Sequence, residues 1–217
     1  MFSEDMHEAV KRYEKRLEEL GLSPQTLGWR SKRQQYVRFE ILAGIGDLHR
    51  RSILDLGCGF GDFYDFLLGK GLEVDYSGYD ISPKFIAIAK EKHPNLNFEV
   101  KDILKDPVEK KFDYVVSSGI FNHKISNNEQ FIKEVFRKSL ELSNQGIAHN
   151  MLSSCVDYRD AKLYYANPSE ILSFCKTLSK RVTLRHDYMP FEFTAYVYKL
   201  DEKDSENIFK NYEYRLP

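Results

Sequence analysis

The sequence lacks the cysteine pairs of metal-bound or disulfide-linked chains, the signal segment of secreted chains and the long apolar runs of membrane-spanning chains. Its 217 residues include three cysteines and no C-x-x-C pair, which argues against a disulfide framework or a zinc knuckle. No run approaches the ~18 apolar residues needed to span a bilayer, and the N-terminus lacks the basic and apolar regions of a secretory signal. The histidines and acids show no metal-ligand spacing. We therefore expect a reduced, soluble, cytoplasmic protein that binds neither a metal nor a membrane.

An excess of charge of either sign is also missing. Lys+Arg 32 against Asp+Glu 33 leave a formal charge of −1, so there is no global field to hold a nucleic-acid backbone, although a local patch escapes this count. The hydrophobic fraction of 42% and charged fraction of 30% are those of an ordinary globular protein. A chain of this length buries roughly 70% of its surface in one domain, enough for a sizeable core.

The order of apolar patterns along the chain predicts an α/β fold. Two helical patterns come first; Ser31 and Gln34 form a capping box for the second. Strands are then expected at 52–56, 76–81, 96–101, 112–117 and 146–152, with helices expected at 62–68, 82–93, 126–142 and 167–178, the last three capped by Ser82, Ser126 and Asn167. Strands alternating with helices at this spacing indicate a parallel sheet with helices on both faces.

The C-terminal part breaks this alternation. Residues 182–188 and 191–200 form two strand patterns joined at Met189-Pro190, too close for a crossover helix, so they must pair antiparallel. We predict a doubly wound, Rossmann-like sheet closed by this hairpin. Helices in residues 1–48 would cover the edge of the sheet at which the ligand binds. The main domain would span residues 49–200, and a polar tail would follow at 201–217.

The most informative motif is the glycine-rich turn D-L-G-C-G-F-G-D at 55–62, between a strand and a helix. Glycines let the backbone turn tightly and approach a ligand, and doubly wound sheets bind nucleotides at this position. A dinucleotide-binding turn has the spacing G-x-G-x-x-G. Here the spacing is G-x-G-x-G, and Asp62 stands where the third glycine belongs, facing the supposed phosphates. With Asp55 before the first glycine, the turn favours a cofactor that carries an amino group and no phosphate.

Residues 53–61, I-L-D-L-G-C-G-F-G, resemble the first motif of class I S-adenosylmethionine-dependent methyltransferases. Three further family landmarks follow in register, and the resemblance covers about residues 50–152. It implies a seven-stranded sheet of order 3-2-1-4-5-7-6 with the last strand antiparallel, S-adenosylmethionine as methyl donor and S-adenosylhomocysteine as product. The residues that the resemblance implies at the cofactor are Asp55, Gly57, Cys58, Gly59, Asp80, Ile81, Asp102, Ile103 and Ser118.

Within this set, the resemblance implies that Asp80 holds the ribose hydroxyls, that Asp102 holds the adenine amino group and that Ile103 lies on the adenine ring. Arg38 is a further candidate, because the planar guanidinium group of arginine can bind the carboxylate at the methionine end of the cofactor through two parallel hydrogen bonds. The alternative for Arg38 is a solvated basic face shared with neighbouring cations at 30–33.

The fourth motif bears on the methyl acceptor. It continues as S-S-G-I at 117–120, whereas the amino-methylating nucleic-acid enzymes of this fold carry N/D-P-P-Y/F. With the neutral charge balance, this points away from nucleic acid and toward a small-molecule acceptor, as in the ubiquinone-biosynthesis and trans-aconitate type that the chain resembles. Candidate pocket residues are Tyr13, Trp29, Phe121 to His123, Tyr158, Tyr164 and Tyr165. His123, just beyond the fourth strand, is the candidate general base; His149 and Asn150 lie inside a strand and are expected to be structural.

Two alternatives stay open at this point. One is a nicotinamide-dependent oxidoreductase, which the turn spacing disfavours. The other is a non-catalytic, methyltransferase-like binding protein, since the acceptor side shows no diagnostic chemistry and function resides in sites rather than in folds. The sequence predicts neither the methylated atom nor the oligomeric state.

Overall fold

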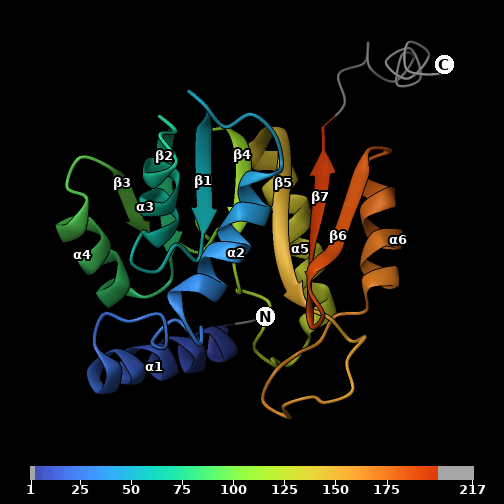
Figure 1. Ribbon diagram of the computed structural model, residues 1–217, viewed down its shortest axis with the longest axis horizontal. Helices are drawn as coiled ribbons and strands as arrows, with labels where there is room; N and C mark the ends of the chain where they lie inside the picture. Colours follow the sequence, from blue (N-terminus) through green and yellow to red (C-terminus); the bar gives the residue numbers. More distant parts are fainter. Residues whose placement is uncertain (1–2, 200–217) are drawn as a thin grey trace.

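The computed structural model describes residues 3–199, which build a seven-stranded sheet of order β3-β2-β1-β4-β5-β7-β6 (Figure 1). The strands are β1 (Ser52–Leu56), β2 (Asp75–Asp80), β3 (Asn97–Val100), β4 (Phe112–Ser117), β5 (Ser143–Leu152), β6 (Val182–Met189) and β7 (Glu192–Tyr198). β1 to β5 pair in parallel, and β7 runs antiparallel to both of its neighbours, β5 and β6. The predicted sheet order and antiparallel ending are confirmed. The predicted tail at 201–217 lies outside the described residues.

Helices cover both faces of this sheet. They are α1 (Ser3–Leu20), α2 (Lys32–Ala43), α3 (Asp62–Gly69), α4 (Pro83–Lys92), α5 (Asn128–Leu142) and α6 (Pro168–Leu178). Side chains of successive strand residues alternate between the faces: Ile53 packs in the cluster under α2, α3 and α4, whereas Leu54 packs in the cluster under α5 and α6. The chain therefore has two apolar cores, one on each side of the sheet.

The helix starts follow the capping signals in the sequence, with one exception. The side chains of Ser31, Ser82 and Asn167 each accept a hydrogen bond from the first turn of their helix, as predicted. The predicted cap at Ser126 is wrong by one residue, because Asn127 accepts from the Gln130 N–H instead. Ser126 donates its hydroxyl to Asp5 of α1 at 2.6 Å, a contact that ties the start of α5 to the N-terminal helix.

α1 lies across the end of the sheet toward which β1 points (Figure 1). The glycine-rich turn between β1 and α3 reaches the same end, which is the carboxyl end of the parallel strands. The topology thus brings α1, the turn and the loops after β2, β3 and β4 together. No helix within residues 3–199 is long and apolar enough to cross a membrane.

Candidate active site

The glycine-rich turn adopts a backbone that requires glycine. Gly57, Gly59 and Gly61 have φ values of +68°, +55° and +78°, in the left-handed region that other residues rarely enter. The N–H groups of Gly57 and Cys58 donate to the carbonyl of Tyr79 at 2.8 and 3.2 Å. The turn is therefore fixed against the end of β2, beside Asp80.

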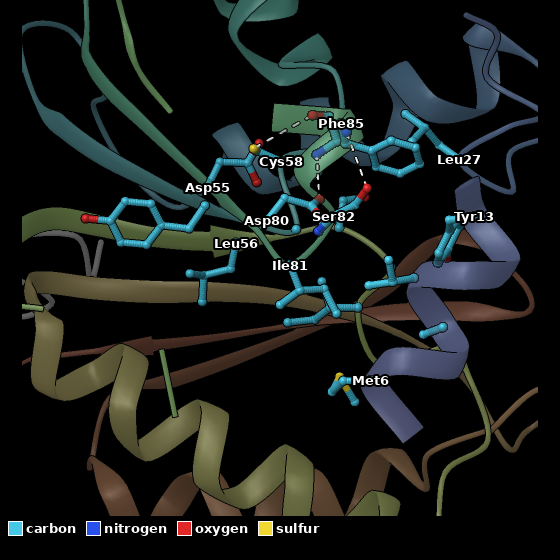
Figure 2. Close-up of a pocket in the computed structure, with 18 of the residues that line it drawn as sticks. Met6, Tyr13, Leu27, Asp55, Leu56, Cys58, Asp80, Ile81, Ser82 and Phe85 are labelled. Carbon is cyan, nitrogen blue, oxygen red and sulfur yellow. Dashed lines mark hydrogen bonds between the residues drawn. The ribbon is translucent and has the colours of Figure 1, made fainter. Parts of the chain in front are cut away.

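Asp80 closes this arrangement with its carboxylate. One oxygen accepts from the Gly59 N–H at 3.0 Å and the other from the Ser82 N–H at 2.9 Å (Figure 2). Burial raises the pKa of Asp80 above its ordinary value, and the backbone donors of Ser82 and Gly59 oppose that rise. A carboxylate offers about four acceptor positions, so Asp80 retains the capacity to bind ligand hydroxyls while holding the turn.

Asp55 is buried, with 4% of its surface exposed. It accepts a hydrogen bond from the Tyr76 hydroxyl at 2.6 Å. Burial raises the pKa of Asp55 to about 7, against the lowering effect of that bond. Asp55 is thus a carboxyl group that titrates near neutrality at the floor of the site.

These residues line a first cavity between the turn, α1 and the loops after β2 and β3. Four carboxyl groups line it, with Lys101 as its one lysine; the four are Asp55, Asp62, Asp80 and Asp102. Ile81, Ile103 and Leu104 supply apolar wall, and α1 contributes Met6 and Tyr13 (Figure 2). Such a set of acids and apolar groups suits a ligand with hydroxyls, an amine and a flat ring, whereas the carboxylates would repel the negative charge of a pyrophosphate. All nine residues of the implied cofactor set line this cavity.

Arg38, the tenth candidate, lies elsewhere. Its exposed fraction is 3% and that of Glu192 is 0%. Arg38 donates through Nε to both Glu192 carboxylate oxygens at 2.8 Å and through Nη1 to the Gln34 carbonyl at 2.8 Å, and it stacks on Trp29 with 4.2 Å between its guanidinium carbon and the ring centre. Its donors are thus engaged away from the first cavity, and we leave Arg38 out of the cofactor set.

A second cavity adjoins the first and is lined by α1, residues 27–30, the loop after β4 and the segment 155–165. Both cavities are lined by Tyr13, Leu27, Trp29, Ser118, Gly119 and His123. The Gly119 N–H donates to the Asn150 side-chain oxygen at 2.8 Å, and the Asn150 amide donates to Glu192 at 2.8 Å. Asn150, expected to be merely structural, thereby holds the loop that separates the two cavities.

His123 lies between α1 and this loop, but its acceptor nitrogen is engaged. Nδ1 accepts from the Arg12 guanidinium at 2.9 Å. Because arginine can only donate, the ring hydrogen lies on Nε2, which donates to the Tyr13 hydroxyl oxygen at 2.7 Å. Burial, and then the charges of Arg12 and Arg16, lower the pKa of His123 to about 4. In this arrangement His123 offers no free lone pair for a proton.

Of the other predicted acceptor-side aromatics, Tyr158 and Tyr165 line the second cavity together with Trp29 and Tyr13. Phe121 does not, because it is 1% exposed in the core under α5. Tyr164 packs against that same core. Sequence reasoning missed Arg12, Arg16 and Glu192 at the site.

Comparison with known proteins settles the family. Residues 53–139 match the family described as "Methyltransferase domain". The chain is 35% identical over 158 residues to "Putative methyltransferase Rv1506c" of Mycobacterium tuberculosis, an alignment that covers 68% of this chain and 93% of that protein. The chain belongs to the class I S-adenosylmethionine-dependent methyltransferases. The alternative of a nicotinamide-dependent oxidoreductase is not favoured, and S-adenosylmethionine is the cofactor of this methyltransferase.

Two further comparisons extend this result. Demethylmenaquinone methyltransferase of Chlorobaculum tepidum is 28% identical over 139 residues, and the match spans 64% of this chain but only 56% of that protein. The plantazolicin methyltransferase BpumL, solved with a triazolic desmethylPZN analog and SAH, superposes with a TM-score of 0.62 at 15% identity, covering 91% of this chain and 99% of that chain. This last similarity shows that the methyltransferase shares BpumL's fold.

Proposed function

We propose that this methyltransferase modifies a small-molecule acceptor bound in the second cavity. The observation that carries the proposal is the shared wall: Tyr13, Trp29, Ser118, Gly119 and His123 line both cavities. A ligand in the first cavity would therefore lie against the same residues as a ligand in the second. The similarity to BpumL, solved in complex with a triazolic desmethylPZN analog and SAH, supports this arrangement.

The first cavity would hold the cofactor through two acids. We assign Asp80 to the ribose hydroxyls, since its carboxylate already faces the turn and retains acceptor capacity. Asp102, fixed by the Leu104 N–H at 3.0 Å and by Lys105, is assigned to the adenine amino group, with Ile81 and Ile103 against the ring. When bound there, S-adenosylmethionine supplies an electrophilic methyl group.

The chain's own contribution to the reaction is positioning. Asn150 fixes the backbone at Gly119, and Trp29 packs so closely on Gly119 that a Cβ there would lie 2.8 Å from the indole ring. These contacts fix the position of the loop that both cavities share. Holding a nucleophile and a methyl group in line provides effective molarities of ~10⁵ M or more, so an acceptor that is already unprotonated needs no dedicated base.

We also infer that nucleic acid is not the acceptor. The second cavity is a concave space in which the aromatic side chains of Tyr13, Trp29, Tyr158 and Tyr165 stand beside charged side chains of both signs; a concave, aromatic-lined space is typical of a small-molecule site. The loop after β4 is S-S-G-I and has no proline pair to hold an extruded base.

The test is methyl transfer from S-adenosylmethionine labelled in its methyl group. Purified protein is incubated with a small-molecule metabolite extract, with total RNA and with DNA, and each fraction is counted. We expect label in the small-molecule fraction, inhibition by S-adenosylhomocysteine, and loss of transfer in Asp80→Ala but not in Asp75→Ala, a control at the opposite end of the same strand. Label confined to RNA or DNA would overturn the proposal.

A further inference from the structure

We propose that the methyl acceptor carries an oxyanion, a carboxylate or a phosphate, and that Arg12 and Arg16 of α1 bind it in the second cavity. This inference rests on the proposed function, because it takes the second cavity to be the acceptor site. It adds the chemical class of the acceptor and two residues that determine specificity.

The two cavities have opposite polarity. Four aspartates and a single lysine line the first. The second is lined by five cations, Arg12, Arg16, Arg30, Arg38 and Lys162, against Asp157 and Asp160. Glu192 pairs with Arg38, and the cations still outnumber the carboxylates. Since the whole chain has a net charge of −1, this positive excess is local to the acceptor side.

Arg12 and Arg16 are the two cations that α1 contributes to the lining of the second cavity. They stand four residues apart on α1, so they share one face of the helix, and Tyr13 beside them lines both cavities. Within residues 3–199 neither forms an ion pair with a carboxylate. Their observed partners are neutral: Arg12 donates to His123, and the Arg16 guanidinium carbon lies 5.8 Å from the centre of the Tyr13 ring. Two unpaired guanidinium groups on one helix face match an oxyanion, which they can bind through paired hydrogen bonds.

Binding of an anion there has a consequence for His123. The oxyanion competes for the Arg12 donor that now occupies Nδ1, and its charge offsets the two guanidinium charges that face the ring from α1. The remaining groups around the ring are the Tyr13 hydroxyl, the Asn128 amide on the His123 carbonyl, and Leu163, which forms a β-bridge with His123; Asp160 and Lys162 line the same cavity. An anionic acceptor therefore frees the Nδ1 lone pair that the unliganded site withholds.

The experiment uses matched probes on the full chain saturated with S-adenosylhomocysteine. 4-Hydroxybenzoate and 4-hydroxybenzamide differ in charge but share an aromatic body that suits the Trp29 and Tyr165 walls; inorganic phosphate is the third probe. Binding is measured by calorimetry at constant ionic strength, and the His123 ring is followed by NMR, with His123→Gln for assignment. The variants are the double substitution Arg12→Gln/Arg16→Gln and the control Lys11→Gln, which removes one positive charge from an exposed position of the same helix outside both cavities.

We expect wild type and Lys11→Gln to bind the benzoate at least about tenfold more tightly than the benzamide, the range of a hydrogen bond to a charged group. In the double variant the preference should fall to about twofold or less. The benzoate, but not the benzamide, should raise the pKa of His123. Tighter binding of phosphate than of benzoate assigns the oxyanion to a phosphate, and the reverse assigns it to a carboxylate.

Equal binding of the two aromatic probes, binding of neither anion, or an anion preference that survives in the double variant would overturn the inference. S-adenosylhomocysteine binding is recorded in the same samples. If S-adenosylhomocysteine binds and neither anion does, only the inference about the acceptor is wrong. If S-adenosylhomocysteine does not bind, the proposed function is wrong as well.

Discussion

The substitution Glu192→Gln tests how the acceptor side is held together. Glu192 is fully buried and accepts hydrogen bonds from Arg38 and from the Asn150 amide. Glutamine keeps the size of the side chain but leaves the Arg38 guanidinium, 3% exposed, without a counter-charge. Removing one partner of a buried ion pair costs about 3–5 kcal/mol. Against a typical domain stability of ~5–15 kcal/mol, Glu192→Gln should lose a large fraction of the free energy of unfolding.

The assay is urea unfolding followed by circular dichroism in a double-mutant cycle with Arg38→Met and Glu192→Leu. We expect each single variant to lose about 3–5 kcal/mol, and the double variant to lose clearly less than the sum, because it leaves no unpaired charge. Asp187→Asn, which breaks the exposed pair with Arg185, is the control and should change stability little. Additive losses, or a Glu192→Gln variant as stable as wild type, would refute the reasoning.

Three further predictions concern the first cavity. Asp80→Ala should weaken S-adenosylhomocysteine binding about tenfold or more, because a hydrogen bond to a charged group is worth about 1.5–3 kcal/mol. An unchanged affinity in calorimetry would mean that Asp80 only holds the glycine-rich turn in place. The pKa of Asp55 in the folded state, about 7, lies above its ordinary value of 3.8, so its stabilising effect is complete below pH ~4 and is lost as the pH rises to 7 and beyond. Asp55→Asn should therefore flatten the pH dependence and be the more stable protein at pH 8, by up to about 4 kcal/mol at 1.36 kcal/mol per pKa unit; urea unfolding that shows the variant less stable at both pH 5 and pH 8 would contradict this. Gly57→Ala should reduce cofactor affinity and stability together, because an added Cβ overlaps the Ile120 side chain at φ +68°; a thermal unfolding midpoint equal to that of wild type would argue against it.

Much of the fold could be predicted because its signals are local. The β4 run from Phe112 to Ser117 is apolar enough to be buried on both faces, and its predicted bounds are those observed. β5 begins at Ser143, earlier than the apolar pattern from Gly146 suggests, because Ser143 pairs with Phe112 in the register of the sheet. Pairing with a neighbouring strand extends a strand through polar residues that no periodicity marks.

The acceptor side was less predictable because its contacts join distant parts of the chain. Arg38 and Glu192 are separated by 154 positions, so the sequence shows a basic helix residue and an acid at the start of a strand without relating them. A charged residue at the start of a strand with no other charge, as Glu192 is in β7, was the available signal. His123 was correctly placed beyond the fourth strand, but its engagement by Arg12 depends on how α1 docks, which local patterns do not encode.

The central claim is that the first cavity, and not another part of the chain, binds the cofactor. The most direct measurement is a titration of ¹⁵N-labelled protein with S-adenosylhomocysteine, and separately with NADPH, followed through the backbone amide signals. The account predicts that S-adenosylhomocysteine shifts the amides of 57–61, 80–82, 102–104 and 118–120 most strongly and that NADPH leaves them unchanged. Shifts concentrated away from these four segments, or a response to NADPH alone, would contradict it.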